Sequence, residues 1–98
     1  MQRFNPGDAV TICKLQETST GAYVMSGDGY FLDTTLYNLL KNKVGLIYRP
    51  DPFDIRYVYI FYPELPGSGL LSFSDPMTKL CYGMYEYLLI PWNGSDIK

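Results

Sequence analysis

The stretch DIRYVYIFYPE, residues 54–64, carries four aromatic rings, and both of its alternating faces are apolar. Aromatic and β-branched residues in such a run predict a strand, and Pro63 ends it. Successive side chains of a strand point to opposite faces. One face therefore carries Ile55, Tyr57, Tyr59 and Phe61, and the other carries Arg56, Val58, Ile60 and Tyr62. Each face must contact either the rest of the fold or another molecule.

Shorter apolar segments on both sides of this stretch predict further strands. They occupy residues 9–13, 43–50, 70–73 and 88–92. Turns rich in Pro and Gly join them, and 98 residues have room for one modest core. The sequence therefore predicts a single, mainly β domain over the whole chain, a small closed or nearly closed barrel of about five strands.

An insert at residues 21–43 interrupts this pattern. Two short apolar runs flank Ser26–Gly29, an arrangement typical of a β-hairpin. Leucines then recur at helical spacing, at positions 32, 36, 39 and 40. With Asp33 as N-cap, we expect one short helix from about Thr34 to Asn42. The polar residues 93–98 read as a flexible tail.

Composition excludes several classes of function. The net charge is −2 and the sequence pI is near 4.8, which disfavours binding to phosphate backbones. No apolar run reaches the ~20 residues needed to span a membrane, and the first residues are too polar for a signal peptide. We therefore expect a cytoplasmic protein, with Cys13 and Cys81 as free thiols.

Catalytic and metal sites find little support in the sequence. The chain has no histidine, so the commonest general base and metal ligand are missing. Asp51 and Asp54 share a loop with Pro52, where aspartate is typical of turns. No spacing of cysteines and carboxylates matches a metal site, and we expect neither a metal nor another cofactor. The sequence predicts a protein that is not an enzyme.

Three segments, FNPGDAVTI, NKVGLIYR and RYVYIFY, together resemble the Src-homology-3-like (SH3-like) small barrels. Within that class they are most similar to KOW-type modules and to the short barrels of tailed-bacteriophage accessory proteins. The residues that carry the resemblance are Phe4, Gly7, Asp8, Val10, Lys43, Gly45 and Ile47. It covers the chain except residues 21–40, and YEYLLIP resembles the closing turn and last strand. It implies a barrel fold with the hairpin and helix as an insertion.

The aromatic residues are the candidate binding site. A small barrel interior accepts Val58 and Ile60 more easily than large rings, so Tyr57, Tyr59 and Phe61 should point outward. The predicted helix could cover them with Leu36, Leu39 and Leu40, or they could form a binding face, since tyrosine adds contact area at low entropic cost. Both hold together if the helix covers only half of the face. The candidate partner-binding residues of this face are Tyr57, Tyr59 and Phe61. The resemblance to SH3-like barrels adds Tyr85, Tyr87 and Trp92, since aromatic residues there could line a groove for extended or proline-rich peptides.

Two functions follow as expectations. The first is a non-enzymatic protein-binding module that contacts another protein or itself. Its size and aromatic content suggest a virus- or phage-encoded accessory protein, either a virion component or an inhibitor of a host protein. The alternative is a KOW-type module that associates with nucleic acid or the ribosome, which the charge disfavours.

Overall fold

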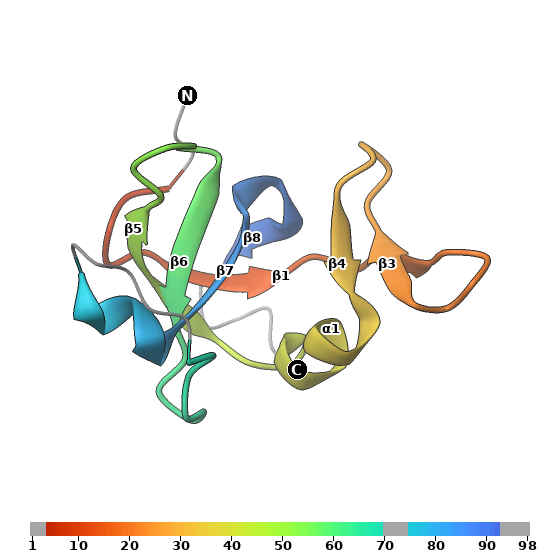
Figure 1. Cartoon of the computed structure of the whole chain (residues 1–98). Helices are drawn as coiled ribbons and strands as arrows, with labels where there is room; N and C mark the ends of the chain where they lie inside the picture. The colour runs from red at the N-terminus through yellow and green to blue at the C-terminus, as the bar shows by residue number, and fades with distance from the viewer. Residues whose placement is uncertain (1–3, 70–74, 93–98) are drawn as a thin grey trace.

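A computed structural model describes residues 4–69 and 75–92, which form two antiparallel sheets and short helices. The larger sheet has the strand order β7-β6-β5-β1-β8. Its strands are β1 (Ala9–Ile12), β5 (Gly45–Pro50), β6 (Tyr57–Phe61), β7 (Cys81–Tyr85) and β8 (Leu89–Pro91). Since β1 pairs with both β5 and β8, the first and last strands lie side by side in this sheet (Figure 1).

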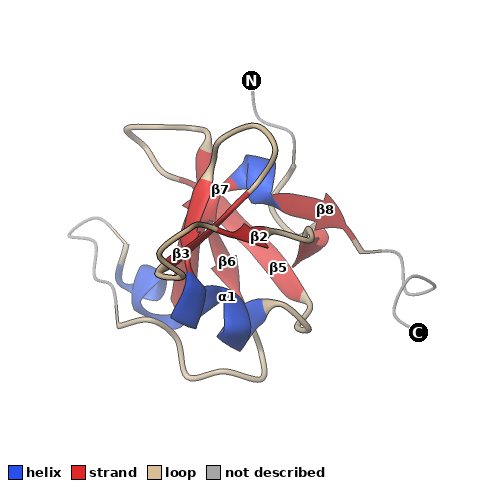
Figure 2. Cartoon of the chain, turned by 90° about the vertical axis from the view of Figure 1, so that its right-hand side faces the viewer, coloured by secondary structure: helices blue, strands red, loops and turns tan. Residues whose placement is uncertain are grey.

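The smaller sheet belongs to the insert between β1 and β5. It consists of β2 (Gln16–Glu17), β3 (Tyr23–Met25) and β4 (Phe31–Asp33), in that order. The helix α1 (Thr34–Leu40) follows β4 directly. Figure 2 shows α1 and this small sheet in front of the larger one. The insert therefore stands beside the five-stranded sheet as one continuous segment of chain.

Local chemistry explains where α1 begins. Asp33 Oδ1 accepts hydrogen bonds from the N–H groups of Thr35 and Leu36, at 2.9 and 3.2 Å. These are first-turn donors that have no partner inside the helix. The helix ends at Leu40, two residues before the predicted end. Asp33 thus joins the edge of β4 to the start of α1.

The core lies against the inner face of β6. Val58, Ile60 and Tyr62 are each at most 1% exposed, so the predicted inward face is confirmed. The other fully buried apolar residues of the main cluster include Val10, Leu40 and Leu88. Complete burial of one such side chain stabilises the fold by about 1.5–3 kcal/mol. Leu40 ties α1 into this cluster, so the insert and the larger sheet share one core.

Most predicted elements are confirmed, and two predictions need correction. The hairpin around Ser26–Gly29 is present, with β3 and β4 as its strands. The barrel, however, is not closed, because β7 and β8 do not pair and the 3₁₀ turn η2 (Glu86–Leu88) carries the chain between them. The second correction is β7 itself, which is not among the strands that the sequence predicts. A 3₁₀ helix, η1 (Pro76–Leu80), lies directly before it.

Two further expectations concern residues beyond these elements. The strand predicted at residues 70–73 and the tail at 93–98 lie outside the described residues. Both cysteines, Cys13 and Cys81, are free thiols, as expected. Within residues 4–69 and 75–92, no helix combines the length and the apolar character needed to cross a bilayer.

Candidate functional site

The outer face of β6 carries the candidate rings, and the structure divides them into separate environments. Tyr59 is buried, with 7% of its surface exposed, whereas Tyr57 and Phe61 are half-buried. All three alternate with the core residues of the inner face. Because they meet different neighbours, they do not form one uniform surface.

Tyr59 is fixed by polar neighbours. Its hydroxyl donates a 2.5 Å hydrogen bond to Asp51 Oδ2, and the Arg49 guanidinium lies 5.6 Å from its ring centroid. Arg49 Nε in turn donates to Asp75 Oδ2 at 2.7 Å. The bond to Asp51 raises the pKa of Tyr59 to about 12 and lowers the pKa of Asp51. Tyr59 is therefore a structural residue covered by Arg49 and Asp51, not an accessible contact.

A chain of tyrosine rings leads away from Tyr59. The ring centroids of Tyr57 and Tyr59 are 6.0 Å apart, and those of Tyr57 and Tyr85 are 5.5 Å apart. Tyr85 lies 5.5 Å from Tyr30, whose ring stacks on Tyr87 at 4.8 Å. Such aromatic pairs contribute about 0.5–1.5 kcal/mol each beyond burial. Tyr30, at the start of β4, thus links the insert to the larger sheet.

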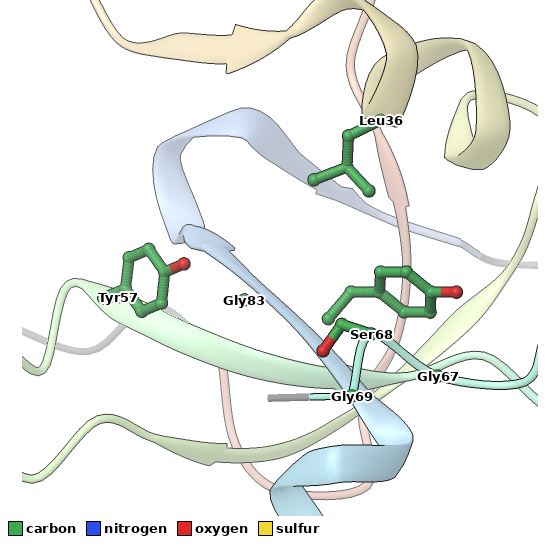
Figure 3. A pocket seen from close by; sticks show the side chains of 7 residues that line it. Leu36, Tyr57, Gly67, Ser68, Gly69 and Gly83 are labelled. Carbon is green, nitrogen blue, oxygen red and sulfur yellow. The ribbon is translucent and has the colours of Figure 1, made fainter. Parts of the chain in front are cut away.

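A groove runs between the insert and β7, beside these rings. Its two adjoining parts, of about 630 and 210 Å³, share Leu36, Tyr57 and Gly83 as lining residues. Figure 3 shows the larger part, with Leu36 extending from α1 towards the strand that carries Gly83. At the other part, Tyr23 and Phe31 form a rim and are 50% and 56% exposed. The groove therefore offers accessible apolar surface on the side of the insert.

Two glycines give the groove its shape. A Cβ atom at Gly83 would lie 2.5 Å from a ring carbon of Tyr57, so the ring occupies the space of a side chain. Gly67 has φ +95°, and a Cβ there would lie 2.6 Å from the Lys79 backbone oxygen. Larger residues at these positions would displace the ring or the loop. The floor and one end of the groove depend on both glycines.

The helix covers the aromatic face only in part. Leu36 lines the groove beside Tyr57, whereas Leu40 is fully buried in the core and Leu39 is 43% exposed. No lining residue of the groove comes from the rest of α1. The helix therefore covers the outward face of β6 only beside Tyr57, through Leu36. The rest of the face next to Tyr57 borders the open groove.

Two candidate residues lie elsewhere. Phe61 lines a separate apolar pocket of about 260 Å³, together with Leu46, Met77 and Cys81. Trp92 lines another pocket, of about 380 Å³, near the N-terminal segment. The structure therefore brings Tyr57 and Tyr85 together in the groove, places Tyr87 next to them through Tyr30, and separates Phe61 and Trp92 from them.

The groove has a mainly apolar and aromatic lining. Burial raises the pKa of Tyr57, so its hydroxyl is neutral at physiological pH. Among the described residues that line the groove, Asp33 is the charged one, and its Oδ1 caps α1. In the part of the chain that the structure describes, no group of three or more acidic or cysteine residues could hold a metal ion.

Several residues of the groove were not among the sequence candidates. They are Tyr23, Phe31, Leu36 and Gly83, and Tyr30, which packs on Tyr85 beside the groove, was not a candidate either. Comparison of the chain with known protein families, with curated proteins and with solved structures finds no match in any of the three. The groove and its residues are therefore the basis for the function proposed below.

Proposed function

We propose that this protein is a non-enzymatic protein–protein interaction module that binds a partner segment in the groove between the insert and β7. The observation that carries the proposal is the groove itself, where Tyr57, Tyr85 and Leu36 meet beside the exposed Tyr23 and Phe31. Interface cores are enriched in aromatic residues and poor in charge, and this lining has both features.

The fold proposal is an open small barrel of the SH3-like type. Two features support it: the first strand pairs with the last, and a 3₁₀ turn separates β7 from β8. In such a sheet the long insertion between β1 and β5 supplies one wall of the groove. Origin in a virus or phage, and a role on a virion or a host protein, stay predictions from size and composition.

Nucleic-acid binding is the weaker alternative. Arg49 and Arg56, the arginines within residues 4–69 and 75–92, are each bonded to an aspartate, Asp75 and Asp54 respectively. Paired guanidinium groups offer less to a phosphate backbone than unpaired ones. A filter-binding titration over salt concentration tests this alternative, which requires an affinity that falls steeply as salt rises.

A random library of displayed twelve-residue peptides tests the proposed groove. Peptides selected on the wild-type chain should lose about tenfold in affinity on the Leu36→Ala variant, because the truncation removes one apolar wall. Affinity can be measured by calorimetry or fluorescence anisotropy. Leu46→Ala is the matched control, since it truncates an exposed leucine in a different pocket and should leave affinity unchanged.

Two results would overturn the proposal. One is a library that yields no peptide binding more tightly than about 1 mM, where the binding free energy falls to about 4 kcal/mol. The other is a set of peptides that lose affinity on Leu46→Ala and not on Leu36→Ala. Thermal unfolding of both variants checks that each is folded during the measurement.

A further inference from the structure

The outer edge of β7 faces the groove, and the direction of its polar groups follows from bonds elsewhere in the sheet. Ile47 N–H donates to Asp8 C=O at 2.9 Å, and Ile47 C=O accepts from Gly7 N–H at 2.7 Å. These groups therefore point away from β6. In an antiparallel pair, two residues opposite each other either both direct their N–H and C=O groups towards the partner strand or both direct them away from it. Ile60 lies opposite Ile47, so it also directs these groups away from the β5–β6 ladder, which means towards β7.

The alternation continues into β7. Ile60 pairs with Tyr82, so that pair is hydrogen-bonded, and the next residue, Gly83, points its N–H and C=O away from β6. The same alternation turns the N–H of Tyr85 outward. Within the described residues, no hydrogen bond involves the Gly83 N–H, the Gly83 C=O or the Tyr85 N–H. The edge of β7 thus presents unpaired donors and an acceptor at the groove.

The chain already pairs with the lower part of this edge. The backbone N–H and the Oγ of Ser68 both donate to Cys81 C=O, at 3.3 and 2.6 Å. Gly69 N–H donates to Lys79 C=O at 3.1 Å. At Cys81 this loop therefore bonds to the outward C=O of β7 as a neighbouring strand would, and no bond between the described part of the loop and Gly83 is present.

The opposite wall of the groove is also a strand edge. Tyr30 C=O accepts from Ser26 N–H at 3.0 Å, on the side of β3, so the next residue, Phe31, directs its backbone groups away from β3. The N–H of Asp33 points the same way. Phe31 and Asp33 line the groove together with Gly83 and Tyr85. The open edges of β4 and β7 therefore border the same groove.

We propose that the partner segment binds in extended conformation and adds as a strand to the edge of β7, through Gly83 and Tyr85. Strand addition uses main-chain hydrogen bonds for affinity and pockets for alternate side chains for specificity. Here Leu36 and Tyr57 supply the apolar pocket. The inference rests on the proposed function and adds to it the conformation of the partner.

Charge specifies the partner further. Both bonds from the helix N–H groups go to Asp33 Oδ1, and no hydrogen bond within the described residues reaches Oδ2. Asp33 gives the groove a negative charge, and none of the described residues that line it is cationic. The segment that fits is therefore an apolar strand with a lysine or arginine near Asp33 and no proline at the pairing positions.

A pair of substitutions at Tyr85 tests the proposal with the peptides selected on the wild-type chain. Tyr85→Ala and Tyr85→Pro remove the same ring, but only proline removes the outward N–H. Tyr85 has φ −68°, which proline adopts, so the sheet itself loses no hydrogen bond. The peptides should bind the proline variant about fivefold more weakly than the alanine variant, the effect of one hydrogen bond.

A scan of N-methylated peptides gives the answer without changing the protein. Each peptide carries one methylated amide, and affinity should fall by tenfold or more when the methyl group is at every second position. The reason is that only alternate N–H groups of a strand face β7. Strand addition would be overturned if the two Tyr85 variants bind the peptides with equal affinity. If the proline variant does not fold, a methylation scan without this two-residue period would overturn it instead. If the peptides then still lose affinity on Leu36→Ala, the groove remains the proposed binding site and only strand addition is rejected. A library that yields no binders would reject both the binding groove and strand addition.

Discussion

The two outer edges of the five-stranded sheet are built differently. On β7, two N–H groups and a C=O point outward without a bond to the described residues. On β8, Leu88 C=O and Trp92 N–H bond to the chain at and just after β1, so the polar groups of Leu89 and Pro91 point outward. The sheet therefore has two comparable edges with different outward groups.

The outward positions of β8 offer no donor to an added strand. Leu89 N–H donates to Glu86 C=O inside the 3₁₀ turn, and Pro91 has no N–H. Proline at an edge is a common means of preventing strand addition. The comparison indicates that one edge is blocked by local chemistry and the other is left accessible beside an apolar groove. An unprotected edge that has neither proline nor charge favours a binding role.

The largest expected effect concerns Gly83, which keeps the β7 edge in place. Gly83→Val should lower the free energy of unfolding by about 2 to 3 kcal/mol, because its Cβ would overlap the ring of Tyr57. Urea denaturation measures the change. In a Tyr57→Ala background the same substitution should cost much less. An equal cost in both backgrounds would show that the ring does not set the requirement for glycine.

The next effect concerns Tyr59, which pairs with Gly83 from the neighbouring strand. Tyr59→Phe should lower the free energy of unfolding by about 1.5 kcal/mol, the contribution of a hydrogen bond to a charged group. The raised pKa, about 12, means that this stabilisation is present below pH 10 and lost between about pH 10 and 12. The Tyr59→Phe variant should lack this part of the loss of stability at alkaline pH.

Tyr62→Phe is the matched control for that experiment. The Tyr62 hydroxyl is buried and has no hydrogen-bond partner within the described residues, so its removal should leave stability equal or higher. The two variants are compared by denaturation at pH 7, because burial also raises the pKa of Tyr62, so that both tyrosines contribute to the loss of stability at alkaline pH. Equal losses at pH 7 would mean that the bond from Tyr59 to Asp51 contributes nothing specific.

The smallest expected effect is at the blocked edge. Pro91→Ala restores an outward N–H on β8 and should change the free energy of unfolding by no more than about 0.5 kcal/mol. Self-association at high concentration should rise, as measured by sedimentation equilibrium. Pro52→Ala, at an exposed loop, is the control and should not associate. If the Pro91→Ala variant remains monomeric, Pro91 is not what prevents strand addition at β8.

The sequence predicts the elements with strong periodicity. The alternation over residues 56–62 identifies both faces of β6, and the leucine spacing with Asp33 identifies α1. β7 was missed, although Tyr82 and Met84 alternate with half-buried neighbours. Glycine in the middle of CYGMY weakens the strand signal, since glycine has low strand propensity and no side chain to show a face.

The groove could be predicted only in part. Tyr57 was a candidate because it lies in the aromatic outward face of its strand, and Tyr85 because of the resemblance to SH3-like barrels. Tyr30 and Leu36 join them only through the packing of the insert on the sheet, a contact between segments distant in sequence. The direction of the Gly83 N–H depends on strand register, which composition and alternation within one strand do not specify.

The insert between β1 and β5 supplies one wall of the groove as a single continuous stretch, from β2 to the end of α1. The other wall belongs to the larger sheet. The two walls are thus genetically separable, and recombination or grafting of that one stretch would give a new recognition specificity on an unchanged scaffold, provided that Leu40 keeps its place in the shared core.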